Sequence, residues 1–500
     1  MTPSASTTVS RQRIDALTVL ALVYLAVPNL IFVIGWFLLP AALILCGVLA
    51  YLLHSALGTR PLAWNLDRSP GAAALLLVAG FGWAAFGGGS HFMYANHDWV
   101  IRDAVLGDLV YSDWPVAYKT PDGTTTVLRS AIGYFLPPAL FGKLFGTAHL
   151  DIAVYLWTVG GVLIFLGLLP LPRRVGWPLL LGIVVTIFFS GMDYLGLVIA
   201  TQTTPIFPLR LEWWGPLSYP SLTGQLLWAP NHCLPIWIGT LLILRHRNED
   251  ELIPLACALL PLTLIWTPFA AIGLAPFVLL CAWKPFFCRA SWNSVPWKPI
   301  IGAAIFSLPI ILFLLIDTNS MTMVSSSAQV QAAAGSNSAN QAVSLHSYLL
   351  FVSCEFLLLA LALAPHVQRE RHLFALALII LLALPLFRFG PSNDSLLRLS
   401  TPPLIVLLVF SLHVILRPER TERSLSLWLV WLFLAIGAHT AFNELWRSAS
   451  FQRWKADYRQ TLSSHHGGGI PPHYGGKLGP SPIARGLKPM THSAEDAKRP

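Results

Sequence analysis

Charge is scarce in this sequence: only 11% of its 500 residues are Asp, Glu, Lys or Arg. In a soluble domain roughly a quarter of all residues are charged, so an ordinary soluble globular protein is excluded. The six cysteines lie mostly inside apolar runs, which argues against a disulfide framework. The sequence also has no phosphate-binding glycine loop, no Gly-x-Ser-x-Gly elbow and no zinc-type ligand spacing. It therefore lacks the signatures of the common soluble enzymes that use nucleotides, a serine nucleophile or zinc.

Apolar runs take the place of the missing charge, and 55% of the residues are hydrophobic. Most runs approach the roughly 20 residues that a helix needs to cross the hydrocarbon core. Because a helix satisfies its own backbone hydrogen bonds in lipid, the runs predict an all-α, polytopic transmembrane bundle of about 13 spans. The shorter run 136–145 predicts a partly embedded helix or a surface helix. We place the spans at about 15–37, 39–57, 71–89, 149–170, 177–198, 231–244, 252–267, 269–283, 299–316, 348–364, 373–387, 402–416 and 425–443.

The basic residues between the runs indicate the topology. They concentrate in alternate loops, for example at Arg68, Arg173 and Arg245, so these loops and residues 1–14 are expected in the cytoplasm. The net charge of +9 is then a topology signal, and nucleic acid is not expected as a partner. No cleavable signal peptide is evident, and the first span is expected to remain as an anchor. The transmembrane domain, 15–444, is predicted to have extracytoplasmic loops at 89–148, 199–229, 317–347 and 388–401, followed by a polar tail, 445–500, whose second half (463–500) is expected to be disordered.

The most polar stretch, residues 94–115, follows the third predicted span. Carboxylates at the mouth of a membrane bundle are costly to hold there, so they are functional candidates. A partly desolvated Asp98 could act as general base on a hydroxyl, with Asp103 as its companion and His97 as a substrate ligand. Asp98 and Asp103 could also hold a divalent cation such as Mg²⁺ or Mn²⁺. The structural alternative is a solvated Asp98 that pairs with Arg102 one helical turn later.

A second polar group is expected at the same outer face and comprises Asp193, Glu212 and His232. Asp193 at the end of a predicted span is costly unless it is paired. An aromatic belt would explain Trp213 and Trp214, which follow Glu212, but it would not explain the three polar residues. Substrate binding by these residues and a belt therefore stand as equal alternatives.

A third polar group, Arg388, Asp394 and Arg398, lies in the last predicted outer loop. Arginines in an extracytoplasmic loop run against the positive-inside bias. Their planar guanidinium groups can donate two parallel hydrogen bonds to a phosphate. Contact with an anionic substrate is one interpretation, and a simple Asp394–Arg398 helix pair is the other. Since three separate segments bring acids, a histidine and arginines to one face, and no nucleotide site is evident, we expect an activated substrate to arrive as a lipid.

An acidic early outer loop followed by basic later loops resembles the layout of the GT-C class of membrane glycosyltransferases. The resemblance implies Asp98 as catalytic base, Asp103 as a second acid, and Arg388 or Arg398 as ligands of a polyprenyl-phosphate-linked sugar. In the class the acid follows the first span, whereas Asp98 follows the third. Five short segments are 96–99 (Asn-His-Asp-Trp), 114–116 (Trp-Pro-Val), 190–193 (Ser-Gly-Met-Asp), 212–214 (Glu-Trp-Trp) and 393–398 (Asn-Asp-Ser-Leu-Leu-Arg). In these segments the chain more closely resembles bacterial multi-span membrane proteins. This resemblance implies a bacterial plasma membrane.

Two functions remain open on this reasoning. The first is transfer of a sugar from a polyprenyl-phosphate donor to an acceptor at the extracytoplasmic face, with membrane lipids as neighbours. The second is a transporter or flippase for a lipid-linked or anionic solute. A carrier is expected to place its charged residues around a cavity near the membrane midplane, whereas the enzyme is expected to place them at one rim.

Overall fold

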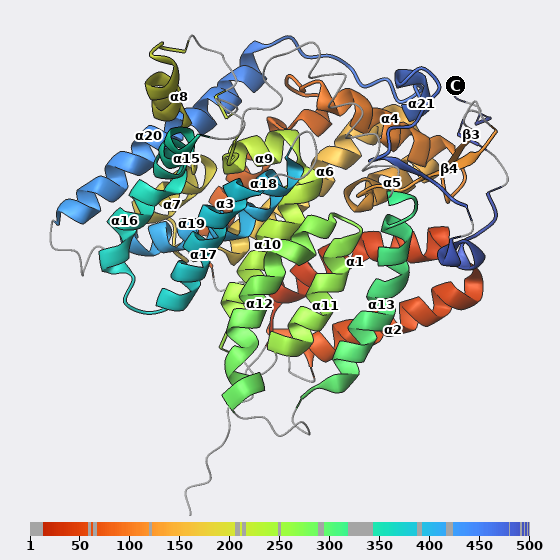
Figure 1. Ribbon diagram of the computed structural model, residues 1–500, viewed down its shortest axis with the longest axis horizontal. Helices are drawn as coiled ribbons and strands as arrows, with labels where there is room; N and C mark the ends of the chain where they lie inside the picture. The colour runs from red at the N-terminus through yellow and green to blue at the C-terminus, as the bar shows by residue number, and fades with distance from the viewer. Residues whose placement is uncertain are drawn as a thin grey trace, which may run out of the picture.

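The computed structural model of the chain is mostly helical (Figure 1), as the apolar runs predict. Seven helical segments are long and apolar enough to cross a membrane among the residues that the structure describes, and the larger number of about 13 stays a prediction. The structure describes residues 14–58, 62–63, 68–119, 123–205, 211–212, 217–248, 252–288, 295–318, 344–387, 393–416, 424–479, 481–490, 493–494, 496–497 and 499.

The helices follow the predicted runs closely in the first two thirds of the chain. Asp15 caps the first of them by accepting from the Thr18 backbone N–H at 3.1 Å. The helices before residue 170 are α1 (Ala16–Trp36), α2 (Leu39–Leu57), α3 (Pro70–Ala85), α4 (Asp98–Tyr111), α5 (Leu136–Phe145) and α6 (Leu150–Leu168). Those that follow are α7 (Trp177–Ile187), α8 (Asp193–Thr201), α9 (Leu222–Trp228), α10 (Pro230–His246), α11 (Leu252–Leu264), α12 (Pro268–Cys288) and α13 (Trp297–Leu314).

The last third continues the helical pattern. Its helices are α15 (Leu345–Val352), α16 (Leu358–Leu363), α17 (Arg371–Ala383), α18 (Asp394–Leu399), α19 (Thr401–Ile415), α20 (Leu425–Ser450) and α21 (Leu462–His465). A π-helical turn, η5 (Ser353–Leu357), joins α15 to α16. Short 3₁₀ turns are η1 (Gly88–Ser90), η2 (Gly133–Phe135), η3 (Thr147–His149), η6 (Ala364–His366), η7 (Leu384–Leu386) and η9 (Pro482–Gly486).

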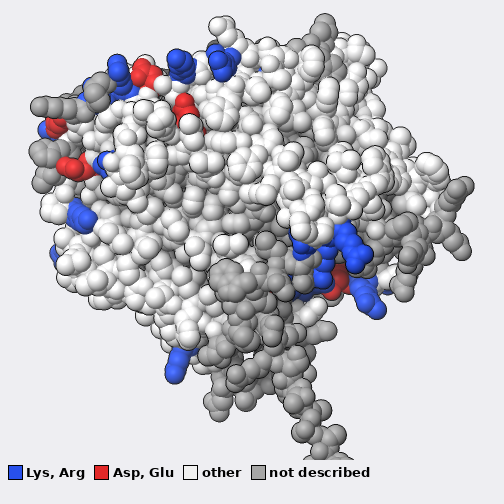
Figure 2. Space-filling view, turned by 180° about the vertical axis from the view of Figure 1, so that it is seen from behind, with Lys and Arg blue, Asp and Glu red and all other residues white. Residues whose placement is uncertain are grey.

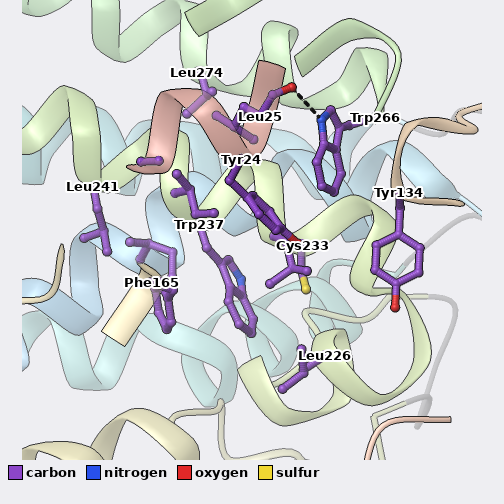
Figure 3. Packing of buried hydrophobic residues seen from close by; sticks show 14 of the residues in the cluster. Tyr24, Leu25, Tyr134, Phe165, Leu226, Cys233, Trp237, Leu241, Trp266 and Leu274 are labelled. Atoms are coloured by element: carbon purple, nitrogen blue, oxygen red, sulfur yellow. Dashed lines mark hydrogen bonds between the residues drawn. The ribbon is translucent and has the colours of Figure 1, made fainter. Parts of the chain in front are cut away.

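Helix α10 runs through the middle of the bundle (Figure 1), where it packs against α6, α12 and α19. Its Trp237 is completely buried and lies 4.5 Å from the Phe165 ring centre and 5.6 Å from that of Trp83. Figure 3 shows this aromatic core, in which the Trp266 indole donates to the Leu25 carbonyl at 3.2 Å. The indoles of Trp83 and Trp237 also have partners, Thr223 Oγ1 and Gln225 Oε1, so these buried donors are satisfied inside an apolar core.

The outer surface is unusually apolar for a protein in water. Leu39, Val78 and Leu425 are at least 70% exposed, and many other large apolar side chains are partly exposed. Figure 2 shows that the charged side chains gather mainly toward the borders of the face in view, with a broad uncharged area between them. Such a surface suits contact with lipid chains. The seven candidate spans are Ala16–Trp36, Leu39–Leu57, Thr147–Leu168, Trp297–Leu314, Leu345–His366, Asp394–Ile415 and Leu425–Ser450.

One predicted span is broken in the structure. The run 177–198 forms α7 and then α8, with residues 188–192 in a non-helical turn between them. The turn packs on η5, where the Met192 N–H donates to the Cys354 carbonyl at 3.0 Å. Gly191 faces the Glu355 carboxylate so closely that a Cβ would collide with it. The prediction of one continuous helix is therefore wrong, because a tertiary contact overrides the apolar pattern.

The C-terminal segment differs from the disorder expected over 463–500. Strand β5 (Gly475–Lys477) pairs antiparallel with β4 (Thr125–Leu128), which in turn pairs with β3 (Ala117–Lys119). Arg499 Nη2 lies 2.5 Å from Oδ1 of Asp108, whose side chain is completely buried. The described part of the tail thus packs on the segment 89–148 and supplies the partner of a buried carboxylate there. The other strands, β1 (Ile14–Asp15) and β2 (Leu62–Ala63), are a parallel pair.

Candidate functional site

Members of all three predicted polar groups meet at one end of the bundle. We call this group the rim cluster. Its residues come from α4, α10 and α18 and are Asp98, Arg102, His232, Asp394 and Arg398. Arg398 lies within electrostatic range of Asp394, Arg102 and Asp98. His232 lies within range of Arg398 and Arg102. Residues separated by about 300 positions are thereby brought together, as the sequence predicts.

Arg102 is the fixed part of the rim cluster. Its Nη1 donates to the Trp228 carbonyl, and its guanidinium lies 5.3 Å from the centre of the Trp99 ring. Its Nη2 lies 3.8 Å from Asp98 Oδ2, so the simple i,i+4 ion pair is present. The Asp98 side chain is 60% exposed and also accepts from Asn96 at 3.3 Å. Asp98 is therefore a solvent-accessible carboxylate beside a buried, immobilised guanidinium.

Several buried polar atoms of α10 and α18 have unused hydrogen-bonding capacity. Within the described residues, Arg398 Nε, His232 Nδ1 and Asn231 Oδ1 have no hydrogen-bond partner. Arg398 also reaches Asp394 only at 3.8 Å, a distance that suits an ion pair better than a hydrogen bond. Buried polar groups are normally satisfied, so donors and an acceptor left open at one place indicate a site that a ligand would complete.

A tail residue lies against the same cluster. Tyr474 is in electrostatic contact with Arg102, Asp98 and Arg398, and burial raises the pKa of its phenol. The ring centre of His473 lies 4.6 Å from that of Tyr474. The tail thus contributes an aromatic side to the site, whereas the sequence predicts only a polar, partly disordered segment there.

Asp103 does not join Asp98. The two acids are five residues apart on α4, which turns their side chains by about 140° from one another. Asp103 is buried and its Oδ2 lies 3.0 Å from Nε2 of His91. Burial raises the pKa of Asp103 to about 6, against the opposing effect of His91. Asp98 and Asp103 therefore do not fit a shared cation, and the described residues contain no group of three or more His, Cys, Asp or Glu that could hold a metal.

The predicted acids Asp193 and Glu212 lie deeper, together with two further acids, Glu355 and Glu444, in what we call the buried acidic cluster. Each is at most 3% exposed. Burial is the main cause that raises the pKa of Glu212 to about 8, and the charges of Glu444 and Asp193 raise it further. Burial also raises the pKa of Asp193 to about 6, although a hydrogen bond with Glu355 opposes it. Glu212 therefore keeps its proton near neutral pH, and the cluster carries less negative charge than four ionised carboxylates would.

Two carboxylates of the buried acidic cluster, Glu212 and Glu444, have specific support. Glu212 Oε1 accepts from both the backbone N–H and the hydroxyl of Ser221. Glu444 accepts from Arg447 Nη1 at 2.7 and 2.9 Å. Glu444 also accepts from the Trp228 indole. The cluster is therefore an ordered part of the interior, and its negative charge is only partly balanced by arginine.

Trp228 connects the two clusters. Its backbone carbonyl accepts from Arg102 of the rim cluster, while its indole N–H donates to Glu444 of the buried acidic cluster. The Arg447 guanidinium lies 5.6 Å from the centre of the same ring. The predicted site residues thus form two adjoining groups and do not line one surface.

Two predicted site residues, His97 and Arg388, belong to neither cluster. His97 is an exposed residue just before α4, and Arg388 lies outside the described residues. Sequence reasoning did not single out Glu355, Glu444 and Arg447. A signal for two of them was available, because Glu355 and Glu444 interrupt apolar runs and an ionisable residue in such a run is a functional candidate.

Comparison of the chain with protein-family models, with curated proteins and with solved structures found no match.

Proposed function

We propose that this protein is an integral membrane glycosyltransferase of the GT-C type, which moves a sugar from a polyprenyl-phosphate donor to an acceptor hydroxyl. The observation that carries the proposal is the rim cluster, in which an accessible carboxylate, Asp98, stands beside the guanidiniums of Arg102 and Arg398. A sugar phosphate needs an anion-binding group, and its acceptor needs a base. The rim cluster offers both at the end of an apolar bundle that a lipid donor could approach.

The proposed reaction needs few groups. Asp98 takes the proton of the acceptor hydroxyl while the hydroxyl oxygen forms a bond to the anomeric carbon of the donor. The bond between that carbon and the phosphate oxygen breaks, and the bonding electrons leave with the polyprenyl phosphate. Arg398, whose Nε has no described partner, donates to the departing phosphate and stabilises its charge. Arg102 is already held by the Trp228 carbonyl and orients Asp98.

The test compares cells that lack the gene with cells that carry the wild type or a variant. Mass spectrometry of envelope glycans and lipid-linked sugars provides the readout. Asp98→Asn should abolish the product or reduce its rate of formation by about 100-fold or more, the usual contribution of a general base. Asp113→Asn is the matched control, because Asp113 is an exposed aspartate that lies just beyond the other end of α4. Full activity of Asp98→Asn in membranes with normal protein levels would refute the assignment.

A carrier for a lipid-linked or anionic solute is the second candidate, and the buried acidic cluster favours it. Glu355 and Glu444 lie on candidate spans, and buried carboxyl groups in such positions are typical of proton-coupled transport. Purified protein in liposomes separates the two. Movement of an intact lipid-linked sugar across the bilayer, without any glycosylated product, would favour the carrier, whereas formation of a covalent product would favour the enzyme.

A further inference from the structure

Helix α20 extends along one side of the bundle, where it packs on α16, α8 and α9 (Figure 1). It contains 26 residues, or about 39 Å, whereas the hydrocarbon core of a bilayer is about 30 Å thick. Exposed tryptophans, Trp428 and Trp446, stand near its two ends, and their separation along the helix is about 27 Å. Tryptophan is enriched at the two surfaces of a membrane. This spacing suits a helix whose last turn and following residues lie at the level of the lipid headgroups.

The end of α20 has its polar side chains toward the protein and its apolar side chains outward. Glu444 and Arg447 are buried and form an ion pair at 2.7 Å. Phe442 and Trp446 lie one helical turn apart on the outer side, where each is 50% exposed, and their ring centres are 6.2 Å apart. A surface helix in water has the opposite arrangement, with its apolar side toward the core. The outward side of this helix end is therefore suited to lipid.

The segment that follows α20 presents two cations away from the bundle. Its Trp454 is held inward, because the indole donates to the Ala95 carbonyl at 2.9 Å and the ring centre lies 4.6 Å from that of His91. The residues on either side of it, Arg453 and Lys455, are exposed, and neither forms an ion pair with a carboxylate that the structure describes. The fixed tryptophan thus keeps both basic side chains just beyond the exposed aromatic rings of α20.

We propose that residues 442–455 bind the headgroups of anionic phospholipids. The exposed aromatic rings lie at the boundary between acyl chains and headgroups, and Arg453 and Lys455 contact the phosphates beyond them. Basic residues next to a membrane span attract acidic lipids, and residues 451–459 contain three basic residues but one acid, Asp457. A zwitterionic headgroup has no net charge for them to attract. This inference does not depend on the proposed glycosyl transfer at the rim cluster.

Two arginines of the same segment provide a matched pair of variants. Arg453 and Arg459 are both exposed, but Arg459 follows Tyr458, whose backbone carbonyl lies against Gly107 of α4 and away from α20. A fluorophore is attached to Ser450→Cys, an exposed position at the end of α20, in the full-length protein in liposomes. Phospholipids that carry a nitroxide near the headgroup quench it on contact. The dependence of quenching on lipid composition gives the local affinity for phosphatidylglycerol relative to phosphatidylcholine, and protein with Ser450 treated identically corrects for labelling of native cysteines.

Phosphatidylglycerol should be preferred at this position. Arg453→Gln should reduce the preference about fivefold, which corresponds to the roughly 1 kcal/mol expected for one basic residue at a membrane surface, whereas Arg459→Gln should change it less than twofold. The preference should also fall as salt rises. Absence of quenching by either lipid would show that the end of α20 lies away from the bilayer. That result would overturn the proposal, as would equal quenching by the two lipids or equal effects of the two variants at unchanged melting temperature.

Discussion

Glu212→Gln should make the stability of this protein less dependent on pH. Glu212 is 3% exposed, and burial with the nearby charges of Glu444 and Asp193 raises its pKa from 4.5 to about 8. A folded-state pKa above the unfolded value means that the stabilisation is complete below about pH 4.5 and is lost as pH rises through 8. Between pH 5 and pH 7 the unfolded chain ionises Glu212 while the folded chain keeps its proton.

The size of the effect follows from this difference. Each pKa unit corresponds to about 1.4 kcal/mol, so the unfolded state gains about 2 kcal/mol between pH 5 and pH 7. Glutamine keeps the oxygen that accepts from Ser221 but has no proton to lose. The stability of the variant should therefore not fall by this amount between pH 5 and pH 7. For a chain of this size the difference amounts to a few degrees in melting temperature.

The assay is thermal unfolding of the purified protein in detergent, followed by tryptophan fluorescence from pH 5 to pH 9. The informative quantity is the melting temperature of the wild type minus that of Glu212→Gln, because other titrating groups, such as Asp193, contribute to both. Asp113→Asn, an exposed control, should follow the wild type at every pH. If the melting temperatures of the wild type and of Glu212→Gln change in parallel across this pH range, Glu212 ionises like an ordinary carboxyl group and the reasoning fails.

Two further predictions concern buried ion pairs. Arg447→Gln should destabilise the protein by about 3–5 kcal/mol, because it removes the charge that holds the fully buried Glu444. The double variant with Glu444→Gln should recover much of the melting temperature, and equal melting of the single and double variants would contradict the explanation. Arg499→Gln should cost roughly 1–3 kcal/mol, because the buried Asp108 loses its charged donor. Arg485→Gln, an exposed arginine of the same tail, should leave the melting temperature unchanged.

Helices and local pairs could be predicted from the sequence because their causes are local. An apolar run of sufficient length predicts a helix, and the spacing of four residues predicts the Asp98–Arg102 and Asp394–Arg398 ion pairs, both observed at 3.8 Å. The expectation that these two pairs lie at one end of the bundle also agrees with the structure. It depended on the alternation of basic loops, which records the side on which each loop lies.

Other features depend on contacts between distant segments. The break after α7 lies in an apolar run, and its cause, the packing of Gly191 on Glu355, involves a residue more than 150 positions later. The spacing of Asp98 and Asp103 suggested a companion pair, but the structure engages Asp103 with His91 on another side of α4. A sequence pattern shows which residues are costly to bury, but it does not identify the partner that makes burial acceptable.

The contact between Arg499 and Asp108 has a practical consequence for handling this protein. A purification tag or a reporter inserted beside Arg499 would adjoin a guanidinium that neutralises an interior carboxylate. Such an insertion should disturb the packing of the tail on residues 89–148, to which β5 is also paired through β4. Labels placed away from Arg499 leave that contact intact.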